Sequence, residues 1–551
     1  MKRFLRLACL LLACLMVVGT LTACDLTEVL DEMFQDDDHA DRDDRYEDDE
    51  EEETKKKPSQ RPADTEAETD SLERPEETTQ WGDTWGEVET SLPQTEPDSS
   101  KDPFKDPFKD PVKDEPLSEE DAALKDLEVD FGGRAFGVLC DSSSYYEVYA
   151  DNESKDGYAA QIINDAVYER NAMLESTLGV DIFVDQVNTG SVATVIKPMV
   201  AAGEDAYQMI DCSLGSTLML ATEGYLLKYG DMGVDLSGSW WDQGTAEFYL
   251  AENIYFMASS SNMWNNDVTY AIMFNKDMYA QYVVDNLYDV VRGGDWTLDY
   301  FNNVMQGIHA DNGDGVWNEY DYYGFVTNYT YANAFFVGAG LRYVDNTYSD
   351  GSIAIMEADA AVSVLDLVQK IYHENYVTYM CAPGQENLGL DMFGNGRGLF
   401  YGDVLQYMKD SLRYADIQIG VLPLPKYDTN QTEYRSLSHA VGSVLSVPVS
   451  AYGGEEVGTI VQAYAVLSHK YVKPAYYNTY MAAVSDEDSM EMLDFIWGNR
   501  VYDLGLCHSY LDVSDFFYTV VNENSDTFVS QYKSRSRSME KKLQTLLRKL
   551  Y

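Results

Sequence analysis

The stretch Ile254–Lys276, IYFMASSSNMWNNDVTYAIMFNK, lies at the centre of the foldable part of this chain. It contains two runs rich in β-forming residues, Ile254–Met257 and Val268–Phe274, joined by a polar loop that carries Trp264. Foldable sequence begins near Val129, and a longer foldable region follows Lys276. The stretch therefore predicts a crossover between two lobes, with a ligand cleft beside it.

Strand and helix patterns alternate on the N-terminal side of this stretch. Short apolar runs predict strands at 134–140, 180–184 and 207–212, and helical spacing predicts helices at 165–178 and 192–202. This alternation favours a parallel sheet and an α/β fold. The polar residues Tyr145, Tyr146 and Ser213 follow predicted strands, at the sheet edge where open α/β folds bind ligands.

The C-terminal side is more helical. We predict helices at 277–291, 298–309, 360–376, 455–472 and 535–550, and strands at 396–401 and 417–425. The strand with Tyr401 ends in the tight turn Gly402-Asp403, which is expected to direct backbone N–H groups and Asp403 towards a cleft.

The net charge of −56 excludes nucleic acid as a partner, because phosphates are bound by Lys and Arg. The acidity is uneven, since residues 25–126 contain 38 acidic and 12 basic residues. This segment has little to bury, so the entropy cost of ordering it would go unopposed. We predict a disordered acidic and proline-containing linker over residues 24–127, which lifts a folded domain off a membrane. An acidic calcium- or partner-binding tail is the alternative.

The N-terminus predicts export. Lys2, Arg3 and Arg6 precede an apolar run from Leu7 to about Leu21, which is short for a membrane span. The run ends in Leu21-Thr22-Ala23-Cys24, which resembles the lipobox of bacterial lipoproteins. The resemblance implies a signal peptide at residues 1–23, cleavage before Cys24 and lipidation of its thiol. A plain signal peptide or a single-span anchor is the alternative.

The cysteine and histidine spacings do not match a metal or redox motif. There is no CxxC, HxxxH or HExxH pattern. The foldable part contains Cys140, Cys212, Cys381 and Cys507, which could pair in three ways. We favour buried free thiols over disulfides.

One loop is similar to the calcium loop D-x-[DN]-x-[DN]-G of EF-hands. Aligned on Gly315, it offers as ligands Asn312, Asp314, the carbonyl of Val316, Asn318 and Asp321. The first ligand position holds Ala310, so the loop lacks one carboxylate, and only weak Ca²⁺ binding is expected. A turn held by its own Asn and Asp side chains is the alternative.

From about residue 130 onward the chain resembles bacterial extracellular solute-binding proteins, in the cluster that supplies carbohydrate ABC importers (family 1). The resemblance rests on segments that recur in order: Trp240-Trp241-Asp242, Ile254-Tyr-Phe256, Tyr270–Lys276, Leu287–Thr297, Asn312–Gly315, Asp321–Phe325, Leu422–Asp428 and Met492–Gly505. Relatives commonly carry Asp where this chain has Ala310.

The resemblance implies an α/β, two-lobed periplasmic-binding-protein-like fold of type II. It assigns residues 128–268 and 397–432 to the first lobe, and 269–396 and 433–551 to the second. It also implies a monomer without enzymatic activity, which delivers solute to ABC permease subunits. A lipid anchor would hold it on the outer face of the cell membrane, in a bacterium without an outer membrane.

A sugar or oligosaccharide is the expected ligand, because sugars stack on aromatic faces and hydrogen-bond to planar polar side chains. The chain has 42 Tyr and 8 Trp. The predicted ligand-binding residues are Trp264, Asn266, Asp267, Tyr145, Tyr146, Ser213, Tyr401, Asp403 and Phe517. A surface adhesin or sensor with the same fold, or a secreted glycosidase, are the alternative functions.

Overall fold

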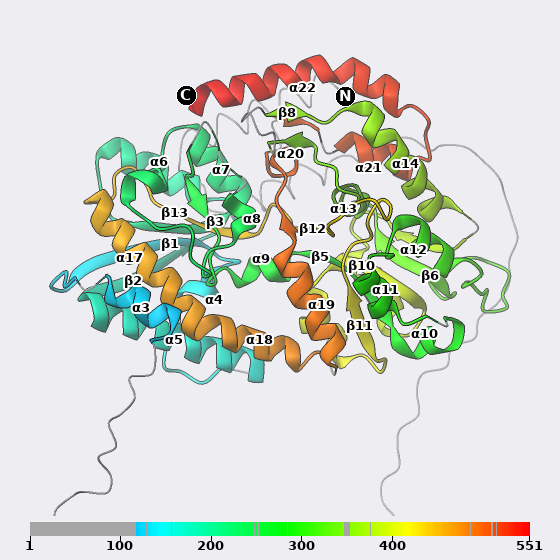
Figure 1. Ribbon diagram of the computed structural model, residues 1–551, viewed down its shortest axis with the longest axis horizontal. Helices are drawn as coiled ribbons and strands as arrows, with labels where there is room; N and C mark the ends of the chain where they lie inside the picture. Colours follow the sequence, from blue (N-terminus) through cyan, green and yellow to red (C-terminus); the bar gives the residue numbers. More distant parts are fainter. Residues whose placement is uncertain are drawn as a thin grey trace, which may run out of the picture. The chain divides into compact units, whose positions relative to one another are not determined.

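The computed structural model describes residues 117–550, apart from residues 128, 156, 247, 249, 251–252, 284, 347–352, 375, 485, 509–510 and 514. The predicted signal peptide, Cys24 and most of the predicted linker lie outside the described residues. Two five-stranded sheets organise the described part (Figure 1). The strand order is β2-β1-β3-β13-β4 in the first sheet and β11-β5-β10-β6-β9 in the second.

The first sheet forms the core of the first lobe. Its strands are β1 (Arg134–Asp141), β2 (Val180–Val187), β3 (Met209–Ser213), β4 (Phe256–Met257) and β13 (Ser443–Ser446). β1 is parallel to β2 and β3, whereas β13 is antiparallel to β3 and β4. The helices of this lobe are α3 (Glu119–Lys125), α4 (Tyr145–Val148), α5 (Tyr158–Leu178), α6 (Val192–Ala202), α7 (Leu214–Thr222), η1 (Tyr229–Met232), α8 (Gln243–Ala246) and α17 (Gly454–Leu467).

The second sheet forms the core of the second lobe. Its strands are β5 (Tyr270–Asn275), β6 (Tyr323–Asn328), β9 (Thr378–Cys381), β10 (Gly398–Val404) and β11 (Ile419–Leu422). β6 is parallel to β9 and β10, whereas β5 is antiparallel to β10 and β11. Every residue of β5 and β6 is buried, so both faces of this sheet are covered.

Helices surround the second sheet and continue to the C-terminus. They are α10 (Lys276–Tyr282), α11 (Leu287–Gly293), α12 (Leu298–Met305), α13 (Ala332–Gly338), α14 (Ala358–His373), α15 (Glu386–Gly394), α16 (Gln406–Asp410), η2 (Leu412–Tyr414), α19 (Glu487–Gly498), α20 (Leu504–Cys507), α21 (Asp515–Asn522) and α22 (Phe528–Leu550). Short strands pair as β7 (Val344–Asp345) with β8 (Ala354–Ile355), and as β12 (Ser436–Leu437) with β14 (Arg500–Val501).

The two lobes are connected at three places. The first connection runs from β4 to β5 through the short helix α9 (Met263–Asp267), and the second runs from β12 to β13. The third is helical: α17 passes through the π-helical turn η3 (Ser468–Val472) into α18 (Lys473–Met481), and α19 then packs on β11. The predicted crossover at 254–276 is therefore confirmed, with a helical turn in place of the expected loop.

The predicted division into lobes was wrong after residue 396. Residues 397–432 contain β10 and β11, which pair with β5 and β6 in the second sheet. Residues 443–446 form β13, which pairs with β3 and β4 in the first sheet. The chain thus returns to the first lobe at β13 rather than at residue 397, because β10 and β11 pair with β5 to complete the second sheet.

The predicted end of the linker was also wrong. Residues 119–125 form the helix α3, in which Ser118 Oγ caps the N-terminus by accepting a hydrogen bond from Asp121 N–H. Ala123 and Leu124 pack against the core of the first lobe. Apolar packing and an ion pair between Lys470 Nζ and Asp121 Oδ1 (2.5 Å) attach this acidic segment to the first lobe.

The α/β class is confirmed, as is the interpretation of the cysteines. Cys140, Cys212, Cys381 and Cys507 are buried free thiols. Among the described residues, none of the helices combines the length and the apolar character that crossing a membrane requires.

A close contact at Gly137 in β1 gives a test of the packing. A Cβ at this position would lie 2.2 Å from Ala206 O and 2.4 Å from Phe183 Cζ. We expect Gly137→Ala to lower the free energy of unfolding by about 1–3 kcal/mol, measured by urea denaturation. Gly454→Ala is the matched control, since its Cβ would meet nothing within 4 Å. Equal stabilities of the two variants would contradict the packing of β1.

Candidate functional site

Asp141 organises the carboxyl end of the first sheet. Its Oδ1 accepts a hydrogen bond from Gly190 N–H (3.0 Å), and its Oδ2 accepts one from Ser213 N–H (2.9 Å). The ends of β1 and β3 and the loop after β2 are thereby held together. The helix α4, which carries Tyr145 and Tyr146, begins at this edge.

Glu147 ties this edge to the crossover. Its buried carboxylate accepts hydrogen bonds from Trp264 N–H of α9 and from Ser443 Oγ of β13 (2.7 Å). Burial, followed by the nearby carboxylate of Asp211, raises the pKa of Glu147 well above its usual value. Burial likewise raises the pKa of Asp211 to about 8. α4 therefore holds α9 and β13 in a fixed position.

The carboxylate of Asp267 joins four elements. Its Oδ2 accepts hydrogen bonds from Lys409 Nζ (2.6 Å) and Tyr146 OH (3.3 Å), and its Oδ1 accepts from Tyr476 OH (2.7 Å) and Tyr480 OH (2.9 Å). The Asp267 side chain is only 2% exposed. Burial, followed by the charge of Asp267, raises the pKa of the three tyrosines well above 10, so their hydroxyls stay protonated as donors.

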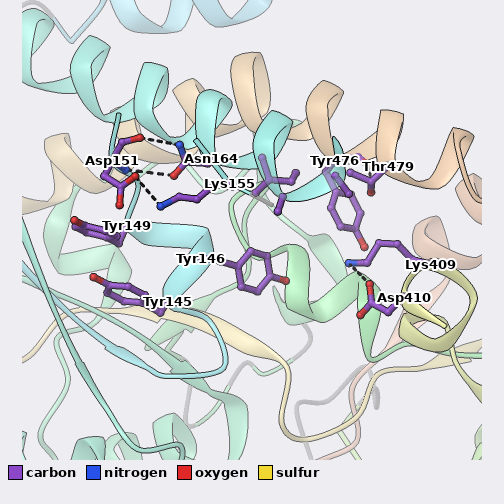
Figure 2. A pocket seen from close by; sticks show the side chains of 13 residues that line it. Tyr145, Tyr146, Tyr149, Asp151, Lys155, Asn164, Lys409, Asp410, Tyr476 and Thr479 are labelled. Carbon is purple, nitrogen blue, oxygen red and sulfur yellow. Dashed lines mark hydrogen bonds and ion pairs between the residues drawn. The ribbon is translucent and has the colours of Figure 1, made fainter. Parts of the chain in front are cut away.

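A cavity of about 450 Å³ lies beside Asp267. It is lined by α4, the loop that follows it and the start of α5 from the first lobe, by α16 from the second lobe, and by α18. Figure 2 shows Tyr146 between the Tyr145–Tyr149 pair and the side that carries Lys409, Asp410 and Tyr476. We call this space the inter-lobe cavity. Its volume is within the range of about 300–1,000 Å³ that is typical of ligand pockets.

Aromatic rings and paired charges characterise the wall of the inter-lobe cavity. The rings of Tyr145 and Tyr149 stack with centroids 4.8 Å apart and planes 12° apart. Lys155 Nζ is 2.7 Å from Asp151 Oδ1, and Lys409 is paired with Asp267. Both lysines that line the cavity are therefore neutralised by carboxylates. Such a wall is suited to an uncharged ligand with a flat face.

The structure brings together three of the predicted ligand-binding residues. Tyr145 and Tyr146 line the inter-lobe cavity, and Asp267 contacts Tyr146 behind it. Trp264 is half-buried on α9, and no described residue accepts a hydrogen bond from its indole N–H. Asn266 faces a different cavity, where its Oδ1 accepts a hydrogen bond from Arg500. Ligand contact by these residues stays a prediction.

The other predicted residues lie away from the inter-lobe cavity. Ser213 ends β3, and its hydroxyl bonds to Ser216 Oγ at 2.9 Å. Tyr401 is 1% exposed, and its OH donates to Asp403 Oδ2 at 3.0 Å, near the carboxyl end of β10. Burial raises the pKa of Asp403 to about 6.

Phe517 belongs to the core rather than to a strand end. It lies on α21, is fully buried, and packs against Phe336 with ring centroids 4.7 Å apart. Its apolar side chain faces the second lobe's interior because α21 is amphipathic and packs on α13 and α14.

The predicted calcium loop is held by its own hydrogen bonds. Asp321 accepts from the backbone N–H groups of Asn312 (2.8 Å) and Asn318 (2.7 Å), and Asp314 accepts from Val316 N–H (2.7 Å). No group of three or more His, Cys, Asp or Glu side chains is placed to hold a metal ion within the described ranges. The geometry corresponds to the alternative of a self-capped turn, and Ca²⁺ binding stays a prediction without structural support.

Sequence reasoning missed Lys409, Tyr476, Tyr480 and Tyr149. Tyr145 and Tyr149 are four residues apart, as are Tyr476 and Tyr480, so helical spacing could have paired each set. Lys409 had no such signal, because its partner Asp267 lies 142 residues away in the sequence.

The sequence profile of the bacterial extracellular solute-binding proteins matches residues 153–471, from the loop before α5 to the turn η3. A search of curated proteins found no match. The GacH receptor of Streptomyces glaucescens, solved unliganded and with acarbose and an acarbose homolog, matches with 13% identity and a TM-score of 0.50. That match covers 74% of this chain and 99% of the receptor.

A second similar structure is a family 1 extracellular solute-binding protein from Bifidobacterium longum subsp. infantis. It matches with 13% identity and a TM-score of 0.50, over 75% of this chain and all of the relative. At such identities the structures establish the shared two-lobed fold, and the profile match covers more than half of the chain. The chain belongs to the bacterial extracellular solute-binding proteins.

Proposed function

We propose that this protein captures a neutral sugar or oligosaccharide between its two lobes and delivers it to the permease subunits of an ABC importer. The observation that carries the proposal is the inter-lobe cavity, in which rings and paired charges from both lobes surround one space. Membership of the solute-binding family and the acarbose complex of the GacH receptor support it.

The lining chemistry favours an uncharged ligand. The stacked Tyr145 and Tyr149 present aromatic surface to a sugar ring, and the polar side chains of Asn164 and Thr479 also line the cavity. An anionic sugar would need an unpaired cation, but Lys155 and Lys409 are each paired with a carboxylate within 2.7 Å. A neutral saccharide needs no such cation.

The origin of the lining residues supports lobe closure around the ligand. Tyr145 and Tyr149 belong to the first lobe, whereas Lys409 and Asp410 belong to α16, which follows β10 of the second sheet. Rotation of the lobes about their connections would separate these walls and open the cavity. Lys409 and Asp267 then form an ion pair that favours the closed arrangement.

The proposed location is the outer face of the cell membrane, with Cys24 as the lipidated anchor and the following acidic segment as the spacer. The lipobox-like sequence and the extracellular character of the family support this location. We propose binding without catalysis, because the matched family is one of binding proteins. Sustained hydrolysis of an oligosaccharide would contradict this, and an adhesin or sensor would bind sugar without permease-dependent uptake.

The first prediction concerns the tyrosine pair. A screen of neutral oligosaccharides by thermal shift should identify a ligand that raises the melting temperature, because it binds only the folded protein. Tyr149→Ala removes one ring of the stacked pair and should raise the Kd of that ligand by about tenfold, measured by calorimetry. Tyr282→Ala, an exposed tyrosine on α10, is the matched control. An unchanged Kd for Tyr149→Ala would remove the pair from the site.

The second prediction concerns the ion pair. Lys409→Met leaves the buried Asp267 carboxylate without its cation, so we expect the free energy of unfolding to fall by about 3–5 kcal/mol. Adding Asp267→Asn should recover a substantial part of this loss, since the unpaired charge is then absent. Urea denaturation of both single variants and the double variant measures the coupling. Strictly additive losses would show that Lys409 and Asp267 do not stabilise one another.

A further inference from the structure

A second cavity of about 360 Å³ lies on the other side of Tyr476 from the inter-lobe cavity. Tyr476 lines both spaces, and Asn266 of α9 lines the second one, next to Asp267 in sequence. The walls of the second cavity come from residues 239–244 and 259–260 of the first lobe, and from α18 and α19 with Arg500. We call it the rear cavity.

Three residues that line the rear cavity carry buried donor groups that lack acceptors. The indole N–H groups of Trp240 and Trp497 and the Nε–H of Arg500 are buried, and no described residue accepts a hydrogen bond from them. Trp240 is 5% exposed and Trp497 is 9% exposed. A buried donor without a partner costs about 1–3 kcal/mol. Three such donors around one space favour a ligand that supplies acceptor oxygens.

The charges around the rear cavity balance one another. Arg500 Nη2 is 2.7 Å from Asp242 Oδ2, which also accepts from Tyr502 OH at 2.8 Å. Lys473 and Asp494 interact electrostatically; partial burial lowers the pKa of Lys473 and raises that of Asp494, and the charge of each opposes the shift of the other. With two cations and two carboxylates, the cavity offers no net charge to attract an ion.

Aromatic surface surrounds these polar groups. Trp497 contacts Tyr476 and Tyr477, with ring centroids 5.9 and 5.3 Å away, and Trp240 lies on the opposite wall, in the first lobe. A sugar ring complements these lining groups. It has apolar faces that stack on aromatic rings, hydroxyl oxygens that accept from indole N–H groups, and hydroxyl hydrogens that can be donated to Asp494.

We propose that the rear cavity is a second saccharide-binding site, which takes one neutral sugar ring independently of the inter-lobe cavity. The donors Trp240, Trp497 and Arg500 hold its hydroxyl oxygens, and Asp494 accepts from a hydroxyl at the rim. The ring lies between the first lobe and the helices α18 and α19.

The test follows the indole N–H signals by ¹⁵N NMR while the full-length protein is titrated with D-glucose, D-galactose, D-xylose and, as anionic probes, D-glucuronate and acetate. Trp240→Phe and Trp497→Phe assign the two signals. We expect at least one neutral sugar to shift both signals with saturation, and to do so equally in Tyr149→Ala, whose substitution lies in the inter-lobe cavity.

Asp494→Asn should raise the Kd obtained from this titration by about tenfold, because a charge-assisted hydrogen bond to the sugar is lost. Glu487→Gln, on the first turn of the same helix and outside the cavity, is the control. Asp494 is exposed, so its variant remains informative if Trp497→Phe does not fold.

Signals of Trp240 and Trp497 that no neutral sugar shifts would overturn the proposal, as would shifts caused only by the anionic probes. This proposal rests on the sugar-binding function, but the result is distinguishable from a failure of sugar binding in the inter-lobe cavity. In that case no oligosaccharide would give a Kd that depends on Tyr149, whereas the indole signals would still respond to a neutral sugar.

Discussion

The buried carboxylate of Asp267 joins parts of the chain that are separated by up to 213 residues. It lies at the end of α9, within the first connection between the lobes, and it accepts hydrogen bonds from α4, α16 and α18. A carboxylate has about four lone-pair sites, and four donors occupy them here. Because Lys409 and Tyr146 also line the inter-lobe cavity, the shape of that cavity depends on this one group.

This arrangement changes how the crossover stretch contributes to binding. Asp267, which is predicted to bind ligand, also positions Tyr146, Lys409 and Tyr476 around the space that a ligand would fill. Asn266, the preceding residue, holds Arg500 at the rear cavity. A single helical turn between the lobes therefore contributes to two cavities, one on each side of Tyr476.

Local sequence patterns predicted most strands and helices, and they located the crossover. The alternation of apolar runs and helical spacing predicted β1 to β3 and α5 to α6, since each pattern is set by residues close in sequence. The assignment of β10, β11 and β13 to lobes failed, because strand pairing is decided by partners more than 100 residues away. The attachment of α3 was missed for a similar reason: Ala123 and Leu124 pack on distant parts of the first lobe.

The candidate site was only partly predictable. Tyr145 and Tyr146 could be found because a polar loop after a buried strand is typical of ligand-binding edges. Lys409 could not, since its partner Asp267 is distant in the sequence, and the helical spacing of Tyr476 and Tyr480 pairs them without indicating that they contact Asp267. Phe517 shows the opposite error, as an aromatic residue in a late segment proved to be part of the core.

The most direct test of the account is a crystal structure of the protein with the oligosaccharide that the thermal-shift screen identifies. The account predicts a sugar ring against Tyr145, Tyr146 and Tyr149, within reach of α16, with Asp267 still bonded to Lys409 and Tyr476. A sugar bound to the surface of one lobe alone, with the inter-lobe cavity unchanged, would contradict it.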